Sequence, residues 1–258
     1  MAEKMLKFIK VERSMPSKRD ASDRKDDFNE IYSEFSRDKA GEQAARCSQC
    51  GVPFCQQGCP LSNNIPDWLK LAAEDRLEEA YQVSSATNNM PEICGRICPQ
   101  DRLCEGICTI EQSGHGTVTI GSIEKYITDN AWDQGWVKPI KPPRERAQSA
   151  GIIGAGPAGL AAAEQLRRKG YQVTVYDAYD RGGGLLVYGI PGFKLEKDLV
   201  DGNCPLHQTK PEWLKERNHF FKLSKYQKPL LEHYRAHPEF LVPEIRRNEK
   251  FGMSDIQT

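Results

Sequence analysis

The sequence predicts a mainly α-helical amino-terminal domain, then the beginning of a doubly wound α/β unit, then an irregular or helical tail. Three observations support this. Two cysteine-rich runs lie among amphipathic helices before residue 137, a glycine-rich turn between two apolar segments follows residue 149, and the glycine pattern stops near residue 198. We therefore divide the chain into residues 1–137, a linker at 138–148, 149–197 and 198–258.

Composition limits the possible partners and the compartment. The 258 residues carry 36 basic and 36 acidic side chains, so no net charge favours nucleic acid as a partner. No segment approaches the roughly 18 apolar residues of a membrane span, and the amino terminus is too charged for a secretion signal. We expect a cytoplasmic protein without membrane contact. In that compartment nine cysteines indicate metal or redox chemistry rather than disulfides.

Helices are expected on both sides of the cysteine runs. The spacing of Phe28, Ile31, Tyr32 and Phe35 predicts a helix within residues 26–46. Pro66 marks a second helix start, with Trp68, Leu71 and Ala72 on one face, and a third helix is expected over 121–133. The segment KPIKPPRERAQ, at residues 138–148, has the proline and charge content of a linker.

The two cysteine runs have different spacings. The first is C-x2-C-x4-C-x3-C-P and the second is C-x3-C-x5-C-x3-C, and together they comprise Cys47, Cys50, Cys55, Cys59, Cys94, Cys98, Cys104 and Cys108. Eight thiolates could make two tetrahedral zinc sites, but zinc ribbons usually pair C-x2-C knuckles. A compact run that ends in Cys-Pro is typical of 4Fe–4S ligation, in which the last cysteine serves another cluster. The spacing favours iron–sulfur clusters over zinc or free thiols.

Three segments, RCSQCGVPFCQQGCPLSNNIPDW, PEICGRICPQDRLCEGIC and GTVTIGSIEKYI, closely resemble the iron–sulfur domain of glutamate synthase small subunits, a domain shared with dihydropyrimidine dehydrogenase. The resemblance extends over about residues 1–197 and implies a helical domain with two 4Fe–4S clusters. It implies one ligand set of Cys47, Cys50, Cys55 and Cys108, and another that contains Cys59, Cys98 and Cys104.

The fourth ligand of the second cluster is left open by the sequence. Some relatives use a Gln or Glu downstream of the last cysteine, and the corresponding position here is Glu124. Cys94 is the competing candidate, and Glu124 would then be a surface charge on a helix.

The segment GAGPAG contains Gly154, Gly156 and Gly159 in the G-x-G-x-x-G pattern, with Pro157 and Ala158 inside it. The segment YQVTVYD predicts a second strand that ends in Asp177, 23 residues after Gly154. These features predict a Rossmann-type dinucleotide site. The pyrophosphate would lie at the helix amino terminus, and Asp177 would bind ribose hydroxyls.

In the resembling family this fingerprint binds FAD, and the following DRGGG segment runs along the flavin. The resemblance adds three further candidate FAD contacts, Arg181, Gly183 and Gly184. The segment AQSAG before Ile152 is less apolar than the family pattern, so we expect a short strand and weak FAD binding.

The resemblance ends near residues 196–199. From KDLVDG onward, residues 198–258 resemble an internal fragment of methionyl-tRNA synthetase, with half of a zinc knuckle at Cys204 and His207. No second fingerprint for NADPH follows. We therefore expect a truncated FAD-binding unit joined to a foreign tail, less stable than the helical domain and not competent for NADPH oxidation alone.

In the family, electrons pass from NADPH to FAD, to the 4Fe–4S clusters and then to a large subunit that forms glutamate. The resemblance thus implies an electron-transfer subunit that has the glutamate synthase large subunit as its partner. Two alternatives remain: the small subunit of another FAD and iron–sulfur oxidoreductase, or a non-catalytic module that binds zinc and contacts RNA or protein.

Overall fold

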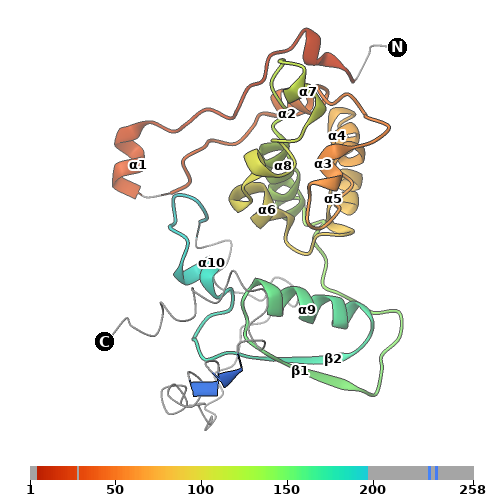
Figure 1. The fold of residues 1–258 in the computed structure, drawn as a ribbon, viewed down its shortest axis with the longest axis vertical. Helices are drawn as coiled ribbons and strands as arrows, with labels where there is room; N and C mark the ends of the chain where they lie inside the picture. Colours follow the sequence, from red (N-terminus) through yellow and green to blue (C-terminus); the bar gives the residue numbers. More distant parts are fainter. Residues whose placement is uncertain (1–4, 28, 197–231, 234–235, 238–258) are drawn as a thin grey trace. The chain divides into compact units, whose positions relative to one another are not determined.

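The computed structural model describes residues 5–27, 29–196, 232–233 and 236–237 (Figure 1). Contacts divide the chain into two units, Met1–Glu212 and Trp213–Thr258. Within the second unit, only the four residues from 232 onward are described. Cys204 and His207, which form half of a zinc knuckle in the sequence, lie outside the described residues. So do residues 197–199, where the resemblance to the first family ends.

The described part of the first unit contains ten α-helices, two 3-10 helices and two strands. Its 3-10 helices are η1 (Lys7–Ile9) and η2 (Gln100–Arg102), and its strands are β1 (Ser149–Ile153) and β2 (Gln172–Tyr176). The α-helices are α1 (Ala21–Asp27), α2 (Arg37–Ala44), α3 (Phe54–Gln57), α4 (Ile65–Ala73), α5 (Leu77–Ser85), α6 (Pro91–Ile97), α7 (Thr109–Gln112), α8 (Ile120–Asp133), α9 (Pro157–Arg168) and α10 (Leu185–Tyr188). None of these helices is long and apolar enough to cross a membrane.

The core of the helical domain forms where α8 lies between α6 and the α4–α5 pair (Figure 1). The apolar side chains of Trp68, Ile123 and Ile127 are fully buried there. The indole Nε1 of Trp68 donates a hydrogen bond of 2.7 Å to Asn63 Oδ1. Asn63 in turn donates to the backbone carbonyl of Ser84 at the end of α5. The predicted helices at Pro66 and over 121–133 are confirmed as α4 and α8.

The predicted helix over residues 26–46 is wrong in its middle. Helix α1 ends at Asp27, α2 begins at Arg37, and Asn29–Ser36 contain no helix. Tyr32 instead pairs with Lys18 in an isolated antiparallel bridge. The carboxylate of Glu30 is bound by two basic side chains of the helical domain. Tertiary contacts of this kind outweigh the weak local preference for helix.

Helix α6 packs closely on α8 at Gly95. A Cβ at this position would lie 2.6 Å from the backbone nitrogen of Lys125. Gly106 is similarly close to the carbonyl oxygen of Asp101, at 2.0 Å from an added Cβ. These two glycines therefore permit close approach of backbone to backbone.

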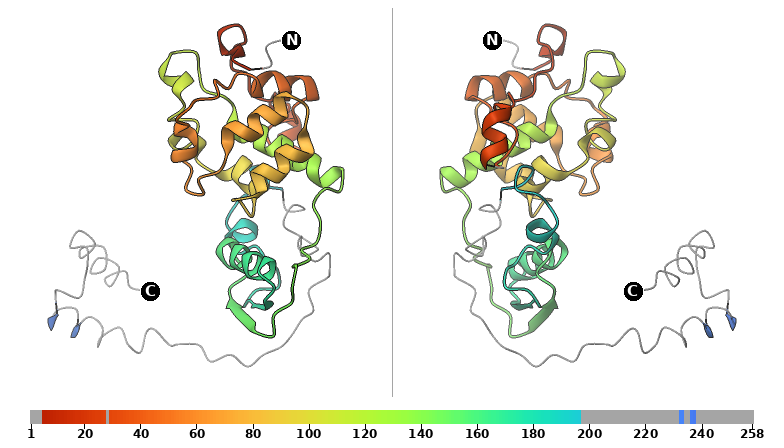
Figure 2. Two further views of the ribbon diagram at one scale, coloured as in Figure 1. Left: turned by 90° about the vertical axis from the view of Figure 1, so that its right-hand side faces the viewer. Right: turned by 90° about the vertical axis from the view of Figure 1, so that its left-hand side faces the viewer.

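The α/β unit consists of two parallel strands connected by α9 (Figure 2). The register pairs Ser149 with Gln172 and Ile153 with Tyr176. Helix α9 packs on both strands, and along each strand exposed residues alternate with half-buried ones. Ile153 is 93% exposed. Strand β1 is five residues long, so the expected short strand is confirmed.

We predict that Gly95→Ala destabilises the protein by about 1–3 kcal/mol, because the new methyl group would force α6 away from the α8 backbone. Gly41→Ala, inside α2, is the matched control, since its nearest neighbour is the Ala72 carbonyl oxygen at 3.8 Å. Without a clash, alanine should be neutral or stabilise α2 by up to about 1 kcal/mol. Urea unfolding followed by circular dichroism measures both variants, and equal stability of the two would contradict the packing argument.

Candidate metal centres

Four cysteines from the two sequence runs line one cavity. Cys47, Cys50 and Cys55 come from the first run, and Cys108 comes from the end of the second. The cavity lies among α3, α4, α7 and the start of α8, and its other walls are mostly apolar. The structure therefore brings together the four residues that the resemblance assigns to one cluster.

The surroundings of this first thiol set indicate that its thiolates form only when metal ions bind them. Burial raises the pKa of Cys47, and it raises the pKa of Cys55 to about 12. Thiols with such pKa values stay protonated at neutral pH unless a metal offsets the charge of the thiolate. Hydrogen bonds to sulfur are also in place, since the backbone N–H of Gln49 lies 3.4 Å from Cys47 Sγ. The donor set thus fits a thiolate-bound metal cluster.

A second thiol set, made of Cys59, Cys98 and Cys104, lies near Glu124 on α8. Burial raises the pKa of Cys104, and the charges of Glu105, Glu124 and Cys59 raise it further. The charge of Cys98 acts in turn on Glu124. Cys98 and Cys104 thus each lie near Glu124, and Cys59 lies near Cys104, although the four come from positions up to 65 residues apart.

Glu124 is a buried carboxyl group, not a surface charge. It is 8% exposed, and its burial raises its pKa to about 8. Asn88 Nδ2 and Ser84 Oγ donate to its Oε1 at 3.2 and 3.4 Å. No cationic side chain among the described residues forms an ion pair with it. Neither Asn88 nor Ser84 lies in a motif, and the sequence therefore gave no signal that they hold this carboxyl group.

Cys94 belongs to the same neighbourhood. Its thiol interacts with that of Cys98, which raises the pKa of Cys94 and lowers that of Cys98. The charge of Glu124 also acts on Cys94. Both candidates for the fourth ligand are thus near the second thiol set. In the described part of the chain, no group of three or more Cys, His, Asp or Glu residues is placed to hold a single metal ion.

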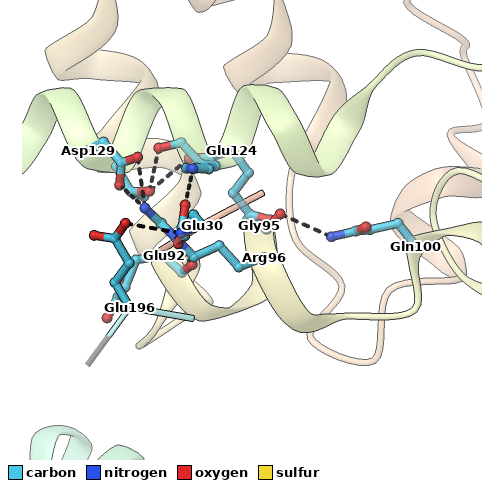
Figure 3. Close-up of polar contacts among 10 residues, drawn as sticks. Glu30, Glu92, Gly95, Arg96, Gln100, Glu124, Asp129 and Glu196 are labelled. Carbon is cyan, nitrogen blue, oxygen red and sulfur yellow. Dashed lines mark hydrogen bonds and ion pairs between the residues drawn. The ribbon is translucent and has the colours of Figure 1, made fainter. Parts of the chain in front are cut away.

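An ion-pair network beside the second thiol set joins Glu30, in the segment between α1 and α2, to α6 and α8 (Figure 3). Arg96, from α6, binds both Glu30 and Asp129, and its two contacts with the Asp129 carboxylate are 2.9 Å long. Lys125 also binds Glu30. The Arg96 side chain is only 6% exposed, so these carboxylates are needed to offset the cost of burying its charge. The network fixes α6, and with it Cys94 and Cys98, against α8.

The candidate dinucleotide site is formed by two glycine loops that pack on each other. Gly154 has φ of 102°, and an added Cβ at Gly159 would lie 1.9 Å from the Gly154 carbonyl oxygen. Gly156 immediately precedes α9, with Pro157 and Ala158 in its first turn. The backbone N–H of Gly183 donates to the carbonyl oxygen of Ala155 at 2.7 Å.

The other candidate cofactor residues lie around these loops. Gly184 has φ of 53° and lies against Gly156, where an added Cβ would be 2.9 Å from the Gly156 Cα. Asp177 follows β2, and its carboxylate accepts hydrogen bonds from the backbone N–H groups of Ala155 and Tyr179. Arg181 is half exposed and lies 4.0 Å from the Asp180 carboxylate. The loops could receive a phosphate at the amino terminus of α9.

Comparison with known families supports both parts of this description. Residues 24–136 match the family described as dihydropyrimidine dehydrogenase domain II, 4Fe-4S cluster. Residues 152–195 match the NAD(P)-binding Rossmann-like domain. The expected order of an iron–sulfur domain and a Rossmann-like unit is therefore confirmed.

Several curated proteins are similar to the chain. The glutamate synthase [NADPH] small chain of Azospirillum brasilense is 72% identical over 204 residues, which are 79% of this chain and 42% of that relative. The corresponding small chain of Escherichia coli is 48% identical over 200 residues, 78% of this chain and 42% of the relative. The putative oxidoreductase AegA of Escherichia coli is 49% identical over 189 residues, 73% of this chain and 28% of the relative. The chain spans less than half the length of these relatives.

We predict that Arg96→Met lowers the free energy of unfolding by about 3 kcal/mol, because Glu30 and Asp129 would lose the cation that compensates their burial. The matched control is Arg76→Met. Arg76 forms its ion pairs with Glu74 and Glu79 at the surface, where such pairs contribute less than about 1 kcal/mol. Denaturant titration of the two variants measures the difference. A loss of stability in Arg96→Met no larger than in Arg76→Met would show that the network is not needed.

Proposed function

The chain is homologous over about four fifths of its length to the small chains of NADPH-dependent glutamate synthase, and from this we propose that it is an electron-transfer subunit with two 4Fe–4S clusters and an FAD site. The observation that carries the proposal is the meeting of Cys108 with Cys47, Cys50 and Cys55 around one cavity. A compact run that receives its fourth thiol from elsewhere is characteristic of cluster ligation.

For the first cluster we propose Cys47, Cys50, Cys55 and Cys108 as ligands. The raised pKa of Cys55 supports this, since a buried thiol of this kind becomes a thiolate only beside a compensating metal. The apolar wall that includes Leu69 and Ile120 would keep water from the ligands.

For the second cluster we propose Cys59, Cys98, Cys104 and Glu124. Glu124 is buried without a cation among the described residues, and its carboxyl group is oriented by Asn88 and Ser84. Ligation would offset the cost of burying the carboxylate. Cys94 is the competing ligand, and it too lies near Cys98 and Glu124.

For the flavin we propose the two packed glycine loops, with Gly154, Gly156 and Gly159 against the pyrophosphate and Asp177 near the ribose. The twelve-residue helix α9 begins directly after Gly156, so its amino end would face the phosphates. Binding a ribose would require Asp177 to exchange its bond with Ala155 for one with a ribose hydroxyl.

Hydride and electron transfer would be the chemistry of the flavin and the clusters, while this chain holds and orients them. The names of the relatives suggest NADPH as the electron source and a large chain as the partner. We propose that NADPH oxidation needs the part of these relatives that this chain does not match, which is more than half of the Azospirillum protein. The match to AegA keeps a second candidate, a subunit of another oxidoreductase with the same iron–sulfur domain.

We predict that the anaerobically purified chain is brown and contains about eight irons, because two 4Fe–4S clusters are expected. Iron and zinc analysis, visible absorbance and EPR of the reduced protein provide the measurements. A colourless protein with stoichiometric zinc would refute the proposal and favour a zinc-binding module.

We predict that Glu124→Ala loses about half of the iron and one of the two EPR signals, because one cluster loses a ligand. Cys94→Ala is the matched comparison and should keep both signals. Full iron content and an unchanged spectrum in Glu124→Ala would remove Glu124 from the ligand set. Loss of one cluster in Cys94→Ala alone would assign that position instead.

A further inference from the structure

Arg46 carries a fully buried positive charge directly before the first cluster-ligand candidate. Its side chain is 0% exposed, and it follows the end of α2. Four of its N–H groups donate to backbone carbonyl oxygens. Nε donates to Val11 at 2.9 Å, Nη1 donates to Thr117 at 2.5 Å, and Nη2 donates to His115 and Gly116 at 2.7 and 2.8 Å.

These hydrogen bonds satisfy the donors of Arg46 but not its charge. Among the described residues, no carboxylate lies within ion-pair distance of this guanidinium group. Arg96, the other deeply buried arginine, binds the carboxylates of Glu30 and Asp129. Burying an arginine among neutral carbonyl groups is costly unless a negative charge lies nearby.

The position of Arg46 indicates where that negative charge would come from. Arg46 directly precedes Cys47 in the chain. The carbonyl groups that accept its hydrogen bonds belong to residues 115–117, and the next residue, Val118, lines the first cavity. The charge of nearby Arg13 opposes its cationic form, whereas the charges of Cys108 and Glu111 favour it. Glu111 is exposed, and its carboxylate accepts a hydrogen bond of 2.6 Å from the backbone N–H of Thr117. The cavity with Cys47 and Cys108 is therefore the buried location for an anion beside Arg46.

We infer that Arg46 is the buried counter-charge of the first 4Fe–4S cluster and a positioning residue that raises its reduction potential. This inference rests on the cluster site proposed above. Four thiolates give such a group a net negative charge, and reduction adds one electron without making or breaking a bond. A fixed cation stabilises the more negative, reduced form, so it raises the potential.

A structural role alone would leave a different signature. Through its four bonds Arg46 also ties the Val11 segment to the 115–117 loop, and this role depends on the shape and donors of the guanidinium group. Lysine keeps the charge but has three donors on a single nitrogen, so it cannot reproduce all four bonds, whereas glutamine loses the charge. Comparison of Arg46→Lys with Arg46→Gln therefore separates charge from scaffolding.

The test is a mediated dithionite titration of the wild-type full-length chain and both variants, followed by EPR, with iron content measured in each. In Arg46→Gln we expect one of the two cluster transitions to become at least tenfold harder to reduce, a downward shift of about 59 mV for one electron. The other transition should not move. In Arg46→Lys both transitions should stay near the wild-type values.

Each alternative result has one meaning. Loss of one cluster in Arg46→Gln but not in Arg46→Lys would also support the counter-charge. Unchanged potentials in both variants, or equal shifts or equal iron loss in both, would overturn the inference and leave the cluster proposal standing. A wild-type chain without iron would instead refute the cluster proposal itself.

Discussion

The close contact of α6 with α8 is the constraint on which the helical domain depends. At Gly95 there is no space for a side chain beside the backbone of Lys125, so the two helices approach as nearly as backbones can. Arg96 lies in α6 and Cys98 directly follows it, whereas Glu124 lies in α8. A small displacement of either helix would move the second thiol set away from Glu124. The same displacement would also weaken the ion-pair network.

Buried charges are compensated in two distinct ways within this domain. Arg96 is surrounded by carboxylates, which makes the network self-sufficient. Arg46 lacks a carboxylate within ion-pair distance among the described residues. Burial raises the pKa of Cys55 to about 12 and that of Glu124 to about 8, so these two acids are protonated at neutral pH unless a metal binds. This difference supports the proposal that bound metal clusters complete the charge balance of the helical domain. Ligation would then contribute directly to folding stability.

The α/β unit depends on packing of a different kind. Its glycine loops fit together because Gly154, Gly159 and Gly184 bring backbone against backbone. Its two described strands contain no buried residue, and Ile153 is almost fully exposed. Parallel sheets normally have both faces covered, so burial stabilises this unit less than it stabilises the helical domain.

The sequence by itself determined the order of the two domains, the helices over 65–73 and 120–133, and the glycine loop before α9, because these features depend on local spacing. It also identified the cysteines, although the grouping of Cys108 with the first run was implied only by resemblance. Tertiary structure decided three matters. The segment around Glu30 is not helical, Glu124 is buried, and Arg46 lies without an acidic partner among the described residues. Contacts between distant segments set the burial and charge environment of these residues, and no local pattern records such contacts.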